Sequence, residues 1–531
     1  MRPKLSRVWV WGASVAAAVP LLFARHLPLS DLPEHVAAIA TLAHYSDASW
    51  RSAEYFQVQG VFRTTYLLYH AVGALFATAL GSAERANTLL LVLTALAMVP
   101  SLAALLRAVR GEERLALVAG PLFWNRALAE GLLNYVASIP VALGALALSV
   151  RHARAPSRKS ALTLGLAAAV LFYLHTSSFA VLLVGATGAA WIFRRAAPRA
   201  SLAVRFPVAA CALLLGPVLV VSNVIAARSG GEHAGVVRFL PTRLLVLTLF
   251  GWMHDVWTSP WDDAAAKALW ALVLAMLLSS AASAGRPRRH RRLAWFFAAL
   301  GPLFYFLLPN QVSYAFILEL RTAPYIGLLG VLLVAPRRGF VARLAAAGLL
   351  GVNVLYGALG AASMARFERE EASHFDLVLR NLPPGRRLLT LVFHTPSEHV
   401  IITPFVHFGA YYRARYGGVA GFSFSELPHW PVTYRPELAP PKKDVTFWDW
   451  NPCLFRNSKD GPYYDFVLVR GDVEPFVDEP AGPRWRVIGV AKDWVLYEKT
   501  ASPYAAGDDR GPCPDAGWLR GLDSPGGRVP R

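Results

Sequence analysis

An aspartate, a glutamate and a histidine lie close together in the first polar stretch of the chain. Asp31, Glu34 and His35 occur in the run Leu-Ser-Asp-Leu-Pro-Glu-His at 29–35, directly before an apolar segment. If a helix begins here, the three side chains stand at i, i+3 and i+4 and share one face. Two carboxylates and an imidazole on one face could exchange a proton with a substrate hydroxyl, which is general acid–base chemistry.

The same residues also have a purely structural interpretation. Asp31 followed three positions later by Glu34 is the pattern of a capping box, and Pro33 is tolerated in a first helical turn. The sequence therefore leaves both catalysis and helix capping open for Asp31.

Three later residues could complete a site. Glu130 could bind substrate or be a helix-end carboxylate paired with Arg126. His175 lies at an expected hairpin and could line a site or be a turn residue. Arg321 suits a phosphate through bidentate, charge-assisted hydrogen bonds, but it could also pair with Glu319 or extend toward lipid headgroups.

Other histidines and aromatics are weaker candidates. A loop at 254–263 is rich in acids and aromatics, which we interpret as an aromatic belt at a membrane surface. His394, His399 and His407 lack a tight zinc-ligand spacing and are assigned to a folded domain. The sequence contains no Walker-type, dinucleotide or G-x-S-x-G motif, which argues against ATP-driven transport and serine hydrolysis.

Composition indicates the environment in which these residues must be positioned. The 531 residues are 55% hydrophobic and 16% charged, with a net charge of +19. A soluble enzyme averages about 25% charged residues, so this chain is typical of a polytopic membrane protein. The basic residues form short clusters between apolar runs, as the positive-inside rule requires, so nucleic acid is not an expected partner.

These clusters predict about eleven spans, with the N-terminus in the cytoplasm and the C-terminal part outside. The apolar stretches 66–80 and 244–252 are expected to lie along the outer face without crossing. The first long outside loop is 25–64. The predicted spans are 8–24, 86–106, 115–128, 132–150, 161–175, 177–193, 206–227, 266–284, 293–308, 323–336 and 341–363.

Beyond the last span the chain changes character. Short β-like runs at 387–393, 465–469 and 494–497 are separated by turn signals, which predicts a small extracytoplasmic α/β domain over 364–501. Residues 502–531 are rich in Gly, Pro and Asp and are expected to be a disordered tail. Cys453 and Cys513 could form a disulfide outside the cell or remain free thiols.

Residues 1–363 resemble, in layout, the GT-C superfamily of polytopic glycosyltransferases that use polyprenyl-phosphate sugars. Asp31 matches the acidic base that follows the first span in this family, Glu130 matches a later outside acid, and Arg321 matches a cation that holds the carrier phosphate. Glu34, His35 and His175 are expected to bind substrate at the same site. Two residues separate Asp31 from Glu34, whereas the family often has adjacent acids, so the use of a divalent metal stays open.

The resemblance implies transfer of a sugar from a polyprenyl-phosphate carrier to a lipid, glycan or protein, with inversion, at the outer face of a bacterial inner membrane. Two other classes stay open. A transporter or flippase of lipid-linked saccharides is one, although the paired, interrupted spans of two related halves are not visible. A non-catalytic envelope assembly protein is the other.

Overall fold

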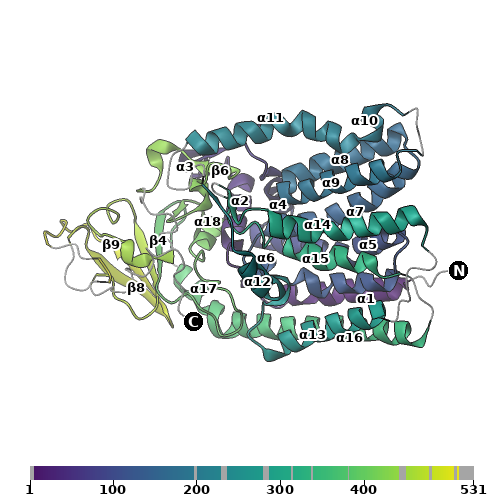
Figure 1. Cartoon of the computed structure of the whole chain (residues 1–531). Helices are drawn as coiled ribbons and strands as arrows, with labels where there is room; N and C mark the ends of the chain where they lie inside the picture. Colours follow the sequence, from purple (N-terminus) through teal and green to yellow (C-terminus); the bar gives the residue numbers. More distant parts are fainter. Residues whose placement is uncertain are drawn as a thin grey trace.

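The computed structural model describes residues 5–195, 200–228, 236–278, 286–312, 315–335, 339–380, 382–441, 450–476, 481–507 and 511–513. Its helices form an elongated bundle, and a β-sheet region lies at one end of it (Figure 1). The N-terminus lies at the opposite end of the bundle (Figure 1). The predicted fold class, a helical membrane bundle followed by a mixed α/β region, is confirmed in this form.

All but one of the predicted spans overlap a long helix or a helix continued by a short turn. Helices long and apolar enough to cross a bilayer cover Ala83–Ala108, Leu133–Arg154, Pro207–Ile225 and Phe340–Leu379. The count of about eleven therefore stays a prediction. The bundle helices are α1 Arg7–Ala18, α4 Leu67–Leu80, α5 Ala83–Ala108, α7 Leu133–Arg154, α8 Arg158–Leu174, α9 Thr176–Ile192, α11 Pro207–Arg228, α12 Thr242–His254, α13 Pro260–Leu278, α14 Arg288–Leu307, α15 Ala323–Gly330 and α16 Phe340–Phe367.

The two stretches expected to lie along the outer face are helical. They form α4, of 14 residues, and α12, of 13 residues. A crossing helix needs about 20 residues, so both are shorter than a span. Residues 279–284 of the predicted span 266–284, and 336 at the end of 323–336, lie outside the described residues.

The prediction of a single helix over 115–128 is wrong. This buried segment is divided into short turns at Glu113–Ala119, Pro121–Phe123 and Arg126–Ala129. A side chain at Gly120 would collide with Asn353 of α16, and the Asn353 amide donates to the Leu117 carbonyl at 2.9 Å. Because irregular backbone is tolerated at membrane depth only inside protein, the segment lies between other helices.

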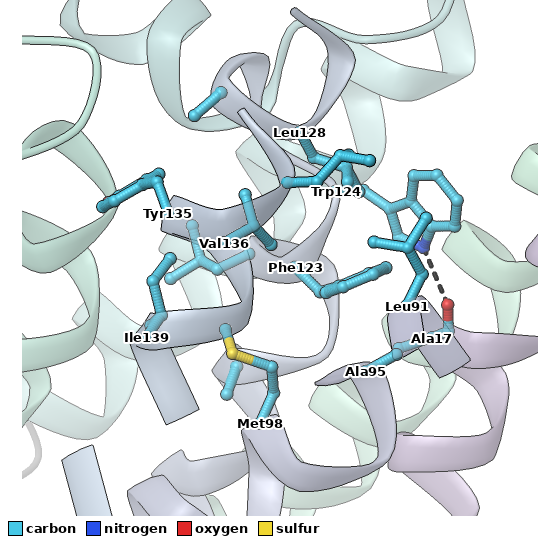
Figure 2. Close-up of a cluster of buried hydrophobic side chains, with 14 of the residues drawn as sticks. Ala17, Leu91, Ala95, Met98, Phe123, Trp124, Leu128, Tyr135, Val136 and Ile139 are labelled. Carbon is cyan, nitrogen blue, oxygen red and sulfur yellow. Dashed lines mark hydrogen bonds between the residues drawn. The ribbon is translucent and has the colours of Figure 1, made fainter. Parts of the chain in front are cut away.

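Trp124 fixes the same segment against the first helix. Its indole Nε1 donates to the Ala17 carbonyl at 3.0 Å, and its ring lies in an apolar cluster with Phe123 and residues of α5 and α7 (Figure 2). A hydrogen bond to a carbonyl of α1 satisfies the polar end of a buried indole. The broken segment leads to Glu130, and its packing therefore determines where Glu130 lies.

The basic loops are connected to one another. Arg286 donates to the carbonyls of Arg110, Leu332 and Val334, which joins three inter-helix connections. His152 Nε2 lies 2.7 Å from the Val204 carbonyl and joins two more. Contacts among these loops agree with a common side, as the charge pattern predicts, while orientation across the membrane stays a prediction.

The C-terminal region contains a five-stranded mixed sheet in the order β5-β4-β7-β9-β8. β4 is parallel to β5 and β7, and the pairs β7–β9 and β9–β8 are antiparallel. The three strands expected from the sequence are β4, β7 and β9. The strands are β4 Arg387–Val392, β5 Val419–Ala420, β7 Phe466–Arg470, β8 Trp485–Ala491 and β9 Trp494–Lys499.

This region is joined to the first outside loop. β1 (Phe56–Val58) pairs with β6 (Val432–Tyr434) in an antiparallel ribbon. Helix α18 (Ala410–Tyr416) packs on α2 (Leu32–Ala43), and the two lie side by side in Figure 1. The boundary at 363/364 stays a prediction, and the two parts share an extensive contact.

Cys453 and Cys513 form a disulfide, with Cα atoms 5.2 Å apart. Ala505 exchanges two backbone hydrogen bonds with Gly482. These bonds hold the chain near its end, and residues 508–510 and 514–531 of the expected tail lie outside the described residues.

Candidate functional site

Asp31 is the residue immediately before α2, but its side chain does not cap the helix. The helix start is closed by the Asp31 carbonyl, which accepts from the amides of Glu34 and His35 at 3.1 and 3.3 Å. The Asp31 carboxylate instead lies 3.4 Å from Nε2 of His407. The capping-box interpretation is therefore wrong, and the Asp31 carboxylate, with 23% of its side chain exposed, is accessible for other chemistry.

Glu130 lies beside Asp31. The Glu130 carbonyl accepts from the Asp31 amide at 3.1 Å. Gly131, with φ +85°, is required next to it, because a Cβ there would lie 2.5 Å from the Asp31 nitrogen. The turn after Arg126–Ala129 thus packs directly against the backbone of Asp31.

The Glu130 carboxylate accepts from Arg126 Nε at 2.7 Å, which is the pairing considered from the sequence. Burial raises the pKa of Glu130, Arg126 opposes this rise, and the charge of Asp31 adds to it. The structure therefore brings together two of the expected acids, Asp31 and Glu130, although 99 positions separate them.

Glu34 faces the C-terminal region. Its buried Oε2 accepts from Arg413 Nη2 at 3.2 Å, from Ser423 Oγ at 2.9 Å and from the Phe424 amide at 3.2 Å. Arg413 is itself buried and lies over the ring of Phe56. Glu34 and Arg413 form a buried ion pair that joins α2 to α18.

His35 faces a third direction. Its Nδ1 lies 3.0 Å from Nε2 of His70, and the two rings are stacked. The Trp430 ring stands edge-on to both imidazoles. Asp31, Glu34 and His35 share a helix but do not converge, because each side chain has a different partner.

Arg321 lies just before α15 and is the third of the residues matched from the sequence. The residue is 9% exposed, its Nε is buried without a hydrogen-bond partner, and no ion pair found among the described residues includes it. Glu319 interacts electrostatically with Arg321 but forms no ion pair with it among the described residues, and its Oε1 accepts from Asn310 at 2.9 Å. A buried cation without a bonded partner is costly, and an anionic ligand would offset that cost.

Two histidines lie in the electrostatic field of Arg321. Burial and the charge of Arg321 lower the pKa of His429 to about 4, so its imidazole is neutral at physiological pH. The second is His175, whose Nδ1 accepts from the Ser177 amide at 3.2 Å and begins α9. The His175 ring lies 5.2 Å from that of Tyr135 and 5.7 Å from that of Tyr66. The structure thus places His175 against Tyr135 and Tyr66 and within the electrostatic range of Arg321.

A continuous set of rings connects the Asp31 end of this region to the Arg321 end. We call the set from Asp31 to Arg321 the polar layer. Neighbouring ring centroids are 5–7 Å apart along the sequence His407, Phe424, Trp430, Tyr66, His429. Aromatic faces of this kind suit the apolar faces of a sugar or a prenyl chain.

Sequence reasoning missed the members of this layer that come from the C-terminal region. His407 and Trp430 reach the site although they are about 400 residues from Asp31 in the chain. The only local signal for His407 is a histidine within an apolar run at 404–408. Nothing in the spacing links it to Asp31.

The loop at 254–263 is largely structural. Asp262 accepts from the amides of Val256 and Trp257 at 3.2 and 3.0 Å, and from the Tyr356 hydroxyl. Trp257 is buried against Trp124, whereas Trp261 is 64% exposed. The aromatic-belt interpretation is therefore compatible with Trp261 but wrong for Trp257.

The metal question stays open at Asp31. Among the described residues, the cluster with ligand atoms close enough for an ion comprises Glu371, Glu398 and His399. It includes neither Asp31 nor Glu130. Metal use at the polar layer is therefore not assigned.

The fold and the polar layer define a polytopic membrane protein whose candidate site lies where the helix bundle meets its C-terminal region. No protein-family model matches the chain, and no curated protein matches it. Similar solved structures are cryo-EM structures of arabinofuranosyltransferase AftD from Mycobacteria.

One AftD structure is 16% identical, with a TM-score of 0.46 over 94% of this chain and 40% of that chain. A mutant of AftD is also 16% identical, with a TM-score of 0.45 over 96% of this chain and 42% of that chain. This chain thus spans about two fifths of the AftD chain. A likeness this distant carries no argument about family or activity.

Proposed function

We propose that this protein is a membrane glycosyltransferase that moves a sugar from a polyprenyl-phosphate carrier to an acceptor hydroxyl on the extracytoplasmic face. The acceptor is a lipid, a glycan or a protein. Two observations in the polar layer support the proposal: the Asp31 carboxylate does not cap its helix, and the buried Arg321 Nε has no hydrogen-bond partner among the described residues. A donor of this kind has both an anomeric carbon and a phosphate.

The proposed reaction is a direct displacement. The acceptor hydroxyl oxygen forms a bond to the anomeric carbon, its proton passes to the Asp31 carboxylate, and the bond from that carbon to the carrier phosphate oxygen breaks. The electron pair leaves with the phosphate. Attack from the opposite side inverts the anomeric centre. A general base contributes about 10² to 10⁴ in rate.

Arg321 is proposed to bind the phosphate and stabilise its charge as it leaves. Fixed charges in a water-poor site often contribute most to catalysis. The neutral imidazole of His429 lies within the electrostatic range of Arg321 and is proposed, together with His175, to hydrogen-bond to phosphate oxygens. No nucleotide is needed, since the leaving group is already part of the donor.

The other polar residues are proposed to position this pair. His407 orients the Asp31 carboxylate, and Glu130 fixes its backbone. Glu34 and His35, expected from the sequence to bind substrate, are proposed instead to hold α2 against α18 and α4.

The test is transfer by the purified full-length protein in proteoliposomes. Polyprenyl-phosphate donors carrying different sugars are supplied, and release of free polyprenyl phosphate is measured together with the anomeric configuration of the product. Release that requires an acceptor, with inversion, is expected. Movement of intact donor across the bilayer without release would identify a flippase and contradict the proposal.

Orientation has a separate test. Reporter fusions after Arg110, Arg154, Arg195 and Arg289 are expected to report cytoplasm, and a fusion after Leu379 the other side. Each intramembrane Arg costs about 2.5–3.5 kcal/mol on insertion scales, which sets the topology. An external signal at Arg154 would overturn the assignment of the polar layer to the outer face.

A further inference from the structure

A second group of polar residues lies where the last long helix of the bundle ends. Helix α16 continues into a π-helical turn, Glu368–Ala372, which leads to α17 (Ser373–Leu379). Glu371 of this turn meets Glu398 and His399 of a loop in the C-terminal region. One ligand atom from each of these three residues lies within 4.8 Å of the others.

Glu371 is the least satisfied member of the group. Its side chain is only 10% exposed, and its Oε2 is buried with no hydrogen-bond partner. Its Oε1 accepts from the Glu398 amide at 2.8 Å and lies 3.7 Å from His399 Nε2. A buried carboxylate oxygen without a partner is costly, and a cation at this point would satisfy it.

Arg470 is a positively charged side chain that could in principle pair with Glu371, but it has other partners. Arg470 influences Glu371 only at longer range, because it lies over the Phe405 ring at 3.6 Å and pairs with Asp493 at 3.5 Å. No ion pair between Arg470 and Glu371 occurs among the described residues. The free oxygen of Glu371 is therefore not explained by this arginine.

The loop that carries Glu398 and His399 is held in place independently of the cluster. Thr258 Oγ1 donates to the Glu398 carbonyl at 2.6 Å, and Ser397 Oγ accepts from the His399 amide at 3.1 Å. A second carboxylate, Glu370, lies 3.0 Å from His399 Nε2. The imidazole edge thus faces carboxylates from the adjoining turn, in a preformed arrangement.

We propose that Glu371, Glu398 and His399 form a binding site for a divalent transition-metal ion, with zinc as the best fit. An imidazole with two carboxylates suits zinc, whereas calcium and magnesium prefer oxygen ligands alone. Two carboxylates balance the charge of one divalent ion. Three protein ligands and a water complete a tetrahedral set, and Glu370 can hydrogen-bond to that water or replace it.

The site would tie the end of α16 to the loop that leads to the polar layer. Four residues after His399, the Thr403 carbonyl accepts from Ser30 Oγ at 3.0 Å, next to Asp31. A further four residues on, His407 reaches the Asp31 carboxylate. A bound ion would therefore restrain the segment that positions His407. The ion would have a structural role and would take no part in the transfer step.

The experiment measures metal content and affinity, and it needs no substrate. The full-length protein, purified in detergent with a histidine-free tag, is stripped with a chelator and titrated with zinc. One zinc ion per chain is expected. His399→Ala and Glu371→Gln should each weaken binding by more than tenfold, and Glu370→Gln by about tenfold.

His394→Ala is the matched control, since His394 belongs to the same loop but is exposed and outside the cluster. Glu398→Gln is the ligand variant that we expect to fold normally, because Glu398 is exposed and its carboxylate is not needed for packing. Zinc should raise the melting temperature of the wild type and of His394→Ala, and should fail to raise that of Glu398→Gln.

Three results would overturn the proposal. One is equal zinc binding by the wild type and all ligand variants, and another is no zinc binding by the wild type. The third is binding of calcium or magnesium in preference to zinc. Because none of these measurements involves sugar transfer, failure of the glycosyltransferase proposal would not affect them.

Discussion

Two regions where the helix bundle meets the C-terminal region each contain an acid and an arginine, and they differ in whether the two charges are paired with each other. At the junction of α2 with α18, Glu34 and Arg413 bond to each other and to neighbouring hydroxyls, although Glu34 Oε1 and Arg413 Nε have no hydrogen-bond partner within the described part of the chain. In the polar layer, Asp31 is bonded only loosely to His407, and Arg321 has no bonded partner among the described residues. A buried ion pair holds two parts of a protein together, whereas an acid and an arginine that are not paired with each other indicate a place for a ligand.

The strongest test of this difference is Asp31→Asn. Asn keeps the size of the side chain, and the structure shows no cap to lose, so the melting temperature should not change. Turnover of a donor that the wild type uses should fall by about 10² to 10⁴. Glu34→Gln is the comparison and should lower stability more than turnover. Wild-type turnover in Asp31→Asn would remove Asp31 from the role of base.

Substitutions in the Glu34–Arg413 pair between α2 and α18 should lower stability. Arg413→Met leaves the Glu34 carboxylate buried without its partner, which should cost about 3–5 kcal/mol of unfolding free energy. The double variant Glu34→Gln/Arg413→Met removes the unpaired charge and should recover most of that loss. Thermal unfolding in detergent measures both. An unchanged melting temperature in Arg413→Met would show that the pair does not hold α2 to α18.

Arg321→Gln tests the unsatisfied charge. Loss of phosphate stabilisation should lower kcat/KM by about 10² to 10³, while the melting temperature should hold or rise, because a buried unpaired charge has been removed. Arg486→Gln is the control, since this arginine is exposed on β8 and pairs with Glu498. A fall in melting temperature with activity retained would assign Arg321 a structural role.

The smallest expected effect concerns pH. Burial alone would lower the pKa of His26, but Asp376 and Glu368, at 3.1 and 3.2 Å, outweigh it and raise that pKa above its ordinary value. A raised folded pKa means that the stabilisation is present below about pH 6.5 and is lost as pH rises through the folded pKa. The melting temperature should therefore decline from pH 6.5 upward.

His26→Gln should flatten this part of the pH profile, since the titrating group is gone. Asp376 acts at the acid end of the profile. Burial alone would raise the pKa of Asp376, but His26 and Arg415 outweigh burial and lower that pKa. The stabilisation that Asp376 contributes is therefore lost only as pH falls toward strong acid. An equally steep decline above pH 6.5 in His26→Gln would assign the effect to another group.

The local features of this protein could be predicted from its sequence. Helix α2 begins after Asp31, the strands at 387–393, 465–469 and 494–497 are present, and the apolar runs form helices. Apolar length, charge clusters and turn residues act within a few positions, so a single sequence contains the information that they need. The broken segment at 115–128 is the exception, because its turns depend on Asn353 and Ala17 of distant helices.

The partners of each candidate residue were decided only by tertiary structure. The sequence placed Asp31, Glu34 and His35 on one helix, but their side chains have partners in three different segments. The partners are His407 in a turn, Arg413 in α18 and His70 in α4. Whether a charge such as Arg321 is bonded or left unpaired depends on residues hundreds of positions away. The bonding of a charged side chain is therefore decided by packing and not by composition, because a hydrogen bond or an ion pair is formed only at contact distance.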